Sequence, residues 1–136
     1  MAREFRLEVG DVMTYPAITE DEDASVAEIS KCMKMSGIGS VVITKEDKPT
    51  GIVTDRDIVI KVMMKNRNPG KVKAKEIMSS PLMTIGADTS LKGACKLIVE
   101  KGIRRLLVIE DGELVGIISL RNIVTGEPLH VRKYLF

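Results

Sequence analysis

The feature that most constrains this chain is an internal repeat. When the 136-residue sequence is shifted by 65 positions, residues 12–59 align with residues 77–124 without a gap. Thirteen of the 48 aligned pairs are identical. They include Pro16 and Pro81, Gly37 and Gly102, and Gly51 and Gly116. Chance would give only a few such matches, so the chain consists of two copies of one unit.

The first half of each copy predicts an extended segment followed by an amphipathic helix. Met13–Thr19 and Met78–Thr84 each contain a proline, which favours a turn or the edge of a sheet. Asp23 or Ser25 can cap the first helix, and Asp88 or Ser90 can cap the second. Apolar residues then recur at helical spacing, and a glycine follows where a helix commonly ends. These are Val26, Ile29, Met33 and Gly37 in one copy, and Leu91, Ala94, Ile98 and Gly102 in the other.

The second half of each copy predicts a hairpin and a final helix. Ser40–Ile43 and Leu106–Ile109 are runs typical of strands, and the Asp-Gly pair after the second run is a hairpin signal. A second strand begins at Gly51 and at Gly116. Asp57–Asn66 then predicts a helix with Ile58, Val59, Val62 and Met63 facing inward. Its counterpart begins at Asn122 but meets Gly126 and Pro128, so we expect it to be short or broken.

The order in each copy is therefore strand, helix, strand, strand, helix, and the expected class is α+β. We expect one copy over residues 8–66, a linker over 67–71 and the other copy over 72–130. Half a chain of this length buries little surface alone, so two copies sharing one core would be stabler.

Composition restricts the classes of function. The chain is 44% hydrophobic and 29% charged, with a formal net charge of +2 and one histidine, as in an ordinary globular protein. This small charge gives little support for binding to nucleic acid or anionic membrane. No stretch approaches the length of a membrane span, and the N-terminus lacks the apolar region of a signal peptide. Cys32 and Cys95 lie in helical apolar patterns outside any metal motif, so we expect buried free thiols and a cytoplasmic protein.

The repeated motifs resemble the CBS domain, a module that occurs in pairs, also called Bateman modules. The resemblance covers residues 8–125. It depends on motifs that occur twice, in order, at one fixed offset. They are Asp11–Pro16 with Glu76–Pro81, Gly37-Ile38 with Gly102-Ile103, and Gly51–Asp57 with Gly116–Asn122. The resemblance implies a stand-alone regulatory pair with pseudo-twofold symmetry, which binds an adenosine nucleotide in the cleft between its repeats.

Thr54 and Asp57 form the most informative motif. They lie at a strand-to-helix junction, where free backbone N–H groups suit a phosphate, and a carboxylate there can accept bonds from ribose hydroxyls. The alternative is structural: Thr54 caps the helix, and Asp57 stabilises the helix dipole from the first turn. Spacing alone favours the structural alternative. The resemblance favours the functional one, because Thr/Ser-x-x-Asp is the ribose–phosphate motif of CBS domains.

The resemblance further implies two nucleotide sites, each built from both repeats. The first takes Thr54, Arg56 and Asp57 from one repeat and Leu82, Met83, Ile103 and Arg104 from the other, with Leu82 and Met83 flanking the adenine. The second takes Arg105, Ser119, Arg121 and Asn122, completed by Ala17, Ile18 and Ile38. No catalytic residue, metal ligand or cofactor is expected. The ligand itself is expected to be AMP, with ADP and ATP as further candidates.

Asn122 departs from the family pattern, because aspartate is usual there. Asparagine has one acceptor oxygen where a carboxylate has two, and losing one charge-assisted bond costs about 1–2 kcal/mol. The first site should therefore bind better than the second, which is weak, empty or used by another ligand. The adjacent Arg104 and Arg105 are either solvated charges or phosphate receptors, in which case a di- or triphosphate fits as well as AMP.

Three classes of function remain open. The best fit is a nucleotide sensor that dimerises through its CBS helices and regulates an unidentified protein partner. A sensor of S-adenosylmethionine is an alternative, because that ligand contains the same adenosine. A nucleic-acid-binding accessory protein would use the basic run of Lys61, Lys65, Arg67, Lys71, Lys73 and Lys75, which is more typical of a solvated face. An enzyme is not expected, because the sequence contains no P-loop, nucleophile–base pair or metal cluster.

Overall fold

The computed structural model describes residues 7–79, 82–126 and 128–130. The chain divides into two compact units. One unit contains Ile18–Leu82. The other combines the described N-terminal segment up to Ala17 with the described chain between Met83 and His130. We call them the central unit and the terminal unit.

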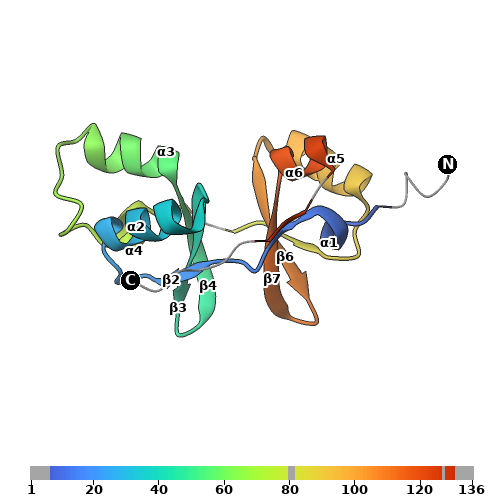
Figure 1. The fold of residues 1–136 in the computed structure, drawn as a ribbon, viewed down its shortest axis with the longest axis horizontal. Coiled ribbons are helices and arrows are strands. Elements are labelled where there is room, and N and C mark those ends of the chain that lie inside the picture. Colours follow the sequence, from blue (N-terminus) through green and yellow to red (C-terminus); the bar gives the residue numbers. More distant parts are fainter. Residues whose placement is uncertain (1–6, 80–81, 127, 131–136) are drawn as a thin grey trace. The chain divides into compact units, whose positions relative to one another are not determined.

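The central unit contains a three-stranded sheet in the order β2-β3-β4. Its elements are β2 (Thr19–Asp21), α2 (Val26–Ser36), β3 (Ser40–Lys45), β4 (Lys48–Thr54), α3 (Asp55–Ile58), the π-helical η2 (Val59–Met63) and α4 (Ala74–Ile77). β2 runs parallel to β3, and β3 pairs antiparallel with β4. α2 and α4 lie on the same side of this sheet in Figure 1.

The terminal unit contains a five-stranded sheet in the order β5-β6-β7-β1-β8. Its elements are α1 (Val9–Val12), β1 (Thr14–Tyr15), β5 (Thr84–Gly86), α5 (Leu91–Lys101), β6 (Arg105–Glu110), β7 (Glu113–Ser119), α6 (Leu120–Thr125) and β8 (Leu129–His130). The register of β6 on β7 is that of β3 on β4 moved by 65 residues: Arg105 faces Ser119 as Ser40 faces Thr54.

The two repeats exchange their opening segments. In the terminal unit, Val9 N–H donates to Thr89 O and Gly10 N–H to Ala87 O, both at 2.8 Å. The central unit repeats this pattern 65 residues away, where Ala74 N–H donates to Ala24 O (2.9 Å). Figure 1 shows the result for α1, drawn in blue, which lies beside the orange elements from the other end of the chain. Each compact unit therefore combines the body of one repeat with the opening segment of the other.

The exchange also completes the sheets. β1 pairs antiparallel with β7, with Thr14 opposite Ile117. In the central unit, Ser79 pairs with Ile52 through hydrogen bonds of 2.9 and 3.1 Å. The opening segment of the central unit thus lies at the edge of its sheet, beside β4, whereas β1 lies between β7 and β8, so the edge expected there is wrong. Each opening segment follows a short helix that the sequence patterns did not predict.

The cores consist of the predicted apolar positions together with residues of the exchanged segments. Val9 and Val12 from α1 pack with Ala94, Ile98 and Leu106 in the terminal unit. In the central unit, Val26, Ile29, Met33, Ala74 and Ile77 are buried. Both long helices end as predicted at a left-handed glycine, Gly37 and Gly102. Their caps are Ser25 and Ser90 rather than Asp23 and Asp88.

The final helix of the first repeat differs from its prediction. It begins at Asp55 rather than Asp57 and changes to π-helical turns over Val59–Met63. Val62 is buried as expected, but Val59 and Met63 are exposed, so their predicted inward orientation is wrong. The wider π turn rotates successive side chains by a smaller angle than the α-helix that the spacing assumed.

The counterpart in the second repeat is short, as predicted, and ends at the left-handed Gly126. It begins at Leu120, two residues before the predicted start. Cys32 is buried, as expected, whereas Cys95 is only partly buried. Among the described residues, no helix combines the length and apolar character that a membrane span requires.

Candidate functional site

The start of α3 holds Thr54 and Asp57 in a capping box. Asp57 N–H donates to Thr54 Oγ1 (3.1 Å), while the backbone N–H and the hydroxyl of Thr54 both donate to Asp57 Oδ2 (2.9 and 3.0 Å). This is the structural alternative that the spacing favours, because capping satisfies N–H groups that have no partner inside the helix. One carboxylate oxygen of Asp57 is thereby committed to the cap.

The second carboxylate oxygen of Asp57 faces a lysine one turn along the helix. Lys61 Nζ lies 3.3 Å from Asp57 Oδ1 and also donates to the backbone carbonyl of Ile77 (2.8 Å). The Asp57 side chain is 14% exposed and that of Lys61 39%. The lysine therefore joins the carboxylate to α4, the helix in the exchanged segment of this unit.

The start of α6 repeats the cap with an amide. Ser119 N–H and hydroxyl donate to Asn122 Oδ1 (2.9 and 2.8 Å), and Asn122 N–H donates to Ser119 Oγ (3.2 Å). The backbone N–H of Ser119 can only donate, which requires the amide oxygen of Asn122 to face it. The replacement of aspartate by asparagine therefore preserves the cap.

The amide nitrogen of Asn122 has a use that the sequence comparison did not indicate. It donates to Thr14 Oγ1 (3.2 Å), on β1 of the exchanged segment. Asn122 is 5% exposed. In each unit the residue three positions after the cap is thus tied to the exchanged segment, through Lys61 in the central unit and directly in the terminal unit.

The remaining predicted site residues divide between the two units. Arg56, Leu82, Ile18 and Ile38 belong to the central unit, and Ala17, Met83, Ile103, Arg104, Arg105 and Arg121 belong to the terminal unit. Arg56, Arg104 and Arg121 are exposed, and Arg105 is half-buried. The assembly of each nucleotide site from both repeats stays a prediction.

Hydrogen bonds position several of these residues near the caps or the sheets. Arg104 O accepts from Leu120 N–H (3.0 Å), which places Arg104 beside the start of α6, as Gly39 lies beside the start of α3. Met83, predicted to flank the adenine of the first site, and Ile18, predicted to complete the second site, hold equivalent places in the two units. Ile18 O accepts from Val42 N–H and Met83 O from Leu107 N–H, so each carbonyl already has a sheet partner.

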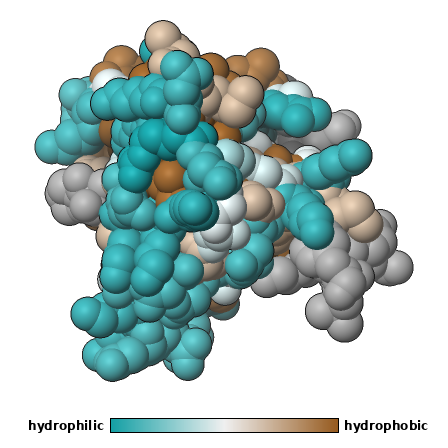
Figure 2. Space-filling view, turned by 90° about the vertical axis from the view of Figure 1, so that its left-hand side faces the viewer, coloured by the Kyte–Doolittle hydropathy of each residue, from teal (hydrophilic) through white to brown (hydrophobic). Residues whose placement is uncertain are grey.

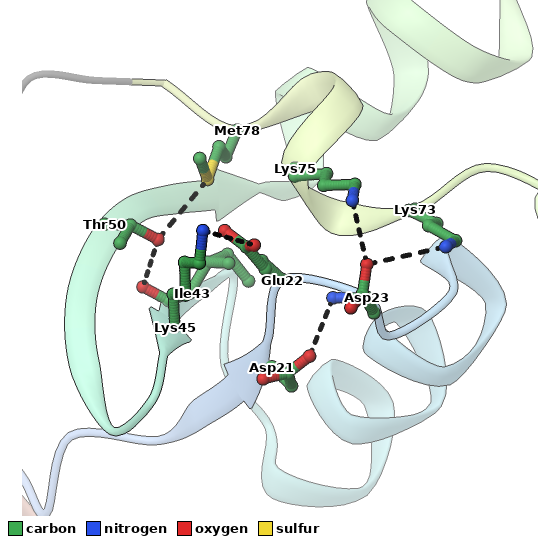
Figure 3. Close-up of polar contacts among 9 residues, drawn as sticks. All are labelled: Asp21, Glu22, Asp23, Ile43, Lys45, Thr50, Lys73, Lys75 and Met78. Atoms are coloured by element: carbon green, nitrogen blue, oxygen red, sulfur yellow. Dashed lines mark hydrogen bonds and ion pairs between the residues drawn. The ribbon is translucent and has the colours of Figure 1, made fainter.

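The terminal unit also contains an open cavity of about 530 Å³ that no sequence motif predicts. It is lined by Glu8, Gly10, Ala87, Asp88, Ile109, Glu110 and Asp111. The matching positions of the central unit are mixed in charge: Lys73 and Lys75 pair there with Asp23 at 3.5 and 3.0 Å, as Figure 3 shows. The hydrogen bond from Lys75, with the charges of both lysines, lowers the pKa of Asp23.

The basic run that could serve nucleic acid is largely paired within the chain. Lys61 lies against Asp57, Arg67 is 2.6 Å from Glu76 Oε1, and Lys73 and Lys75 share Asp23. These internal partners favour the solvated-face interpretation of the run.

Lys61 and Thr14 are the site residues that sequence reasoning missed. The i, i+4 spacing of Asp57 and Lys61 on a helix could have indicated that pair. The contact between Asn122 and Thr14 spans 108 residues of sequence, and no local pattern marks it.

Comparison with known proteins identifies the repeat. The sequence model of the CBS domain matches residues 9–63 and again residues 74–126. An uncharacterised protein of Methanopyrus kandleri is 45% identical over 122 residues, which cover 88% of this chain and 62% of that protein. The CBS domain-containing protein YhcV of Bacillus subtilis is 29% identical over 119 residues, covering 88% of this chain and 84% of YhcV.

A solved structure supports the same fold. The hexameric CBS-CP12 protein from bloom-forming cyanobacteria superposes with a TM-score of 0.80 at 30% identity, covering 88% of this chain and 71% of the other. CBS pairs are commonly regulatory modules that bind ligands. The doubled family match, the exchanged opening segments and the order of elements agree, and the chain belongs to the CBS domain family as a tandem pair of repeats.

Proposed function

We propose that this CBS pair is a regulatory sensor that binds an adenosine nucleotide, AMP before ADP or ATP, with Asp57 as its main ribose ligand. The observation that carries the proposal is the Thr54–Asp57 box, which fixes a carboxylate at the start of α3 in the position of the family's ribose–phosphate motif. A carboxylate held in one orientation can accept hydrogen bonds from vicinal hydroxyls without first being ordered.

The second repeat supports only a weaker site in this proposal. Asn122 commits its oxygen to Ser119 and its nitrogen to Thr14, so little of its hydrogen-bonding capacity remains for a diol. Because this side chain is also nearly fully buried, a ligand would have to break the Thr14 contact to reach it. We therefore propose one principal nucleotide per chain.

Calorimetric titration against AMP, ADP, ATP and S-adenosylmethionine tests this function. Saturable binding of an adenosine nucleotide at one principal site supports it. Preference for S-adenosylmethionine would keep the adenosine site but change the ligand class. Absence of binding to all four compounds would overturn the proposal.

The same proposal assigns no catalytic role to the described residues and treats the regulated protein as a partner yet to be identified. A nucleic-acid accessory role is disfavoured by the internal pairing of the basic run. Such a role predicts DNA or RNA binding that weakens steeply with added salt, which a titration at two salt concentrations would detect.

We also propose that the chain forms a homodimer through its helices. Val59, Ile60, Met63 and Met64 form an exposed apolar face on η2 and the residue after it, with Met63 63% and Met64 71% exposed. Figure 2 shows brown surface along the top of the view, above a mainly teal flank. Apolar surface that gathers on one face commonly marks an interaction site. The CBS-CP12 protein from cyanobacteria, which resembles this chain, is hexameric.

A further inference from the structure

Asp57 has little free capacity for a ligand in its present arrangement. Its Oδ2 accepts two bonds from Thr54, which the cap of α3 requires. Only Oδ1 is left for a ribose diol, and Lys61 Nζ already lies 3.3 Å from that oxygen. A nucleotide that uses Asp57 must therefore share Oδ1 with Lys61 or displace it.

Lys61 is at the same time a structural contact of the exchanged segment. Its ammonium donates to Ile77 O (2.8 Å), at the last residue of α4. The chain beyond Ile77 continues as Met78, which packs against Gly51, and Ser79, which pairs with Ile52. Figure 3 shows further attachments of this segment, in which Lys73 and Lys75 reach Asp23 and Thr50 contacts Met78.

The second repeat is built differently at this point. The residue 65 positions after Lys61 is Gly126, which has no side chain to bridge the two elements. Asn122 instead bonds Thr14 directly, through a neutral contact. The charged, half-exposed connection is therefore specific to the repeat that retains the aspartate.

We propose that Lys61 is a regulatory residue of the first site, resting on the proposed nucleotide function. Its ammonium group pairs with Asp57 Oδ1 when no nucleotide is bound, and the ribose displaces that ammonium group when the nucleotide binds. Displacement removes the bond to Ile77 O and loosens the segment from Ala74 to Ser79. Ligand binding and attachment of this segment then oppose each other, because both depend on one ammonium group.

Titration of AMP into the wild type, Lys61→Met and Lys65→Met tests the competition. Lys65 is an exposed lysine one turn further along, so its variant carries the same change in net charge. We expect Lys61→Met to bind AMP about two- to five-fold more tightly than Lys65→Met, the range that a partly exposed ion pair allows. Equal or weaker binding by Lys61→Met overturns the competition.

Hydrogen exchange tests the effect on the exchanged segment. In the wild type, AMP should raise the exchange rates of the Met78 and Ser79 amides, which donate to Ala74 O and Ile52 O. In Lys61→Met these rates should be high without AMP and change little on its addition. Rates that AMP leaves unchanged or lowers in the wild type contradict the proposal.

The two proposals fail differently. If none of the three proteins binds AMP or another adenosine compound, the nucleotide function and the competition both fail. If all three bind with equal affinity, the nucleotide function stands and the role of Lys61 fails.

Discussion

At the scale of single residues, two repeated glycines show what the sequence can predict and what it cannot. Gly51 and Gly116 are identical under the 65-residue shift, and this marks them as important without giving a reason. The reason is the exchanged segment. A Cβ on Gly116 would lie 2.6 Å from Thr14 O, and a Cβ on Gly51 would lie 2.5 Å from Met78 Sδ. Such contacts between distant segments cannot be read from local patterns.

These distances predict unequal costs for the two alanine variants. Gly116→Ala meets the Thr14 carbonyl, which can move only if β1 moves with it. Gly51→Ala meets Met78, whose Sδ and Cγ can move by a change of rotamer, so that only the contact of 2.9 Å with the Met78 Cβ requires a backbone shift. We expect Gly116→Ala to lower the free energy of unfolding by about 1–3 kcal/mol, the usual cost of overpacking, and Gly51→Ala to cost less. Urea denaturation measures both. A larger loss for Gly51→Ala would contradict the assigned contacts.

The cap residues show a second limit at this scale. The Thr54–Asp57 spacing could be interpreted as a cap or as a ligand site, and the structure contains the cap. The sequence predicted Asn122 as a weaker ribose ligand than an aspartate, and the structure adds that its amide nitrogen donates a hydrogen bond to Thr14. The sequence identified the cap positions, but the second partners of Asp57 and Asn122 depend on the tertiary fold.

At the scale of elements, the long helices and hairpins follow the sequence closely, except that β4 and β7 begin at Lys48 and Glu113 rather than at Gly51 and Gly116. Helical spacing, serine caps and terminal glycines place α2 and α5, and apolar runs typical of strands place the hairpins β3–β4 and β6–β7. The final helix of the first repeat departs from its prediction, because π-helical turns over Val59–Met63 place predicted core residues on the surface. The short helices α1 and α4 were missed because four residues carry too little periodicity.

The attachment of α4 depends on pH in a predictable direction. The bond and charge of Lys75, with the charge of Lys73, keep the pKa of Asp23 below its ordinary value of 3.8. The pairing therefore stabilises the fold at pH values above the ordinary pKa of Asp23, and this stabilisation is lost as the pH falls through the lowered pKa. The same contact raises the pKa of Lys75 above its ordinary value of 10.5. In alkaline solution the stabilisation is therefore lost only as the pH rises through that raised pKa.

Asp23→Asn tests this direction. The difference in unfolding free energy between wild type and variant should stay constant through neutral pH. It should shrink in acid, at pH values below the ordinary pKa of an aspartate carboxyl group. Chemical denaturation at a series of pH values measures it. A difference that grows as the pH falls would contradict the sign of the shift. Asp111→Asn, in an exposed hairpin turn, is the control for a general loss of charge.

At the scale of the whole molecule, the exchange of opening segments makes each unit depend on both repeats. A repeat boundary drawn along the sequence does not separate the compact units, because α1 and β1 lie with the body of the second repeat and α4 lies with the body of the first. The sequence predicted the repeat and its fold class. It did not predict the exchange, because a segment adjacent to its own repeat gives no sign of packing on the other.

The exposed apolar face on η2 predicts how the assembly state responds to substitution. Replacing Met63 and Met64 with lysine should convert a proposed homodimer into a monomer, because burying two ammonium groups at an apolar interface is strongly unfavourable. Sedimentation equilibrium of the wild type and the double variant measures the masses. Replacing Lys65 and Lys71 with methionine is a control outside the apolar face. A monomeric wild type, or a dimeric double variant, would contradict this interface.

The central claim is that the aspartate of the first repeat, and not the asparagine of the second, binds the nucleotide. Asp57→Asn should fold normally, because Asn122 shows that an amide completes the same cap in this chain. The most direct measurement is AMP titration of the wild type, Asp57→Asn and Asn122→Asp by calorimetry. We expect one principal site in the wild type, about 5- to 30-fold weaker binding in Asp57→Asn, and a strengthened second site in Asn122→Asp. Two equal sites in the wild type, or undiminished binding by Asp57→Asn, would contradict the account.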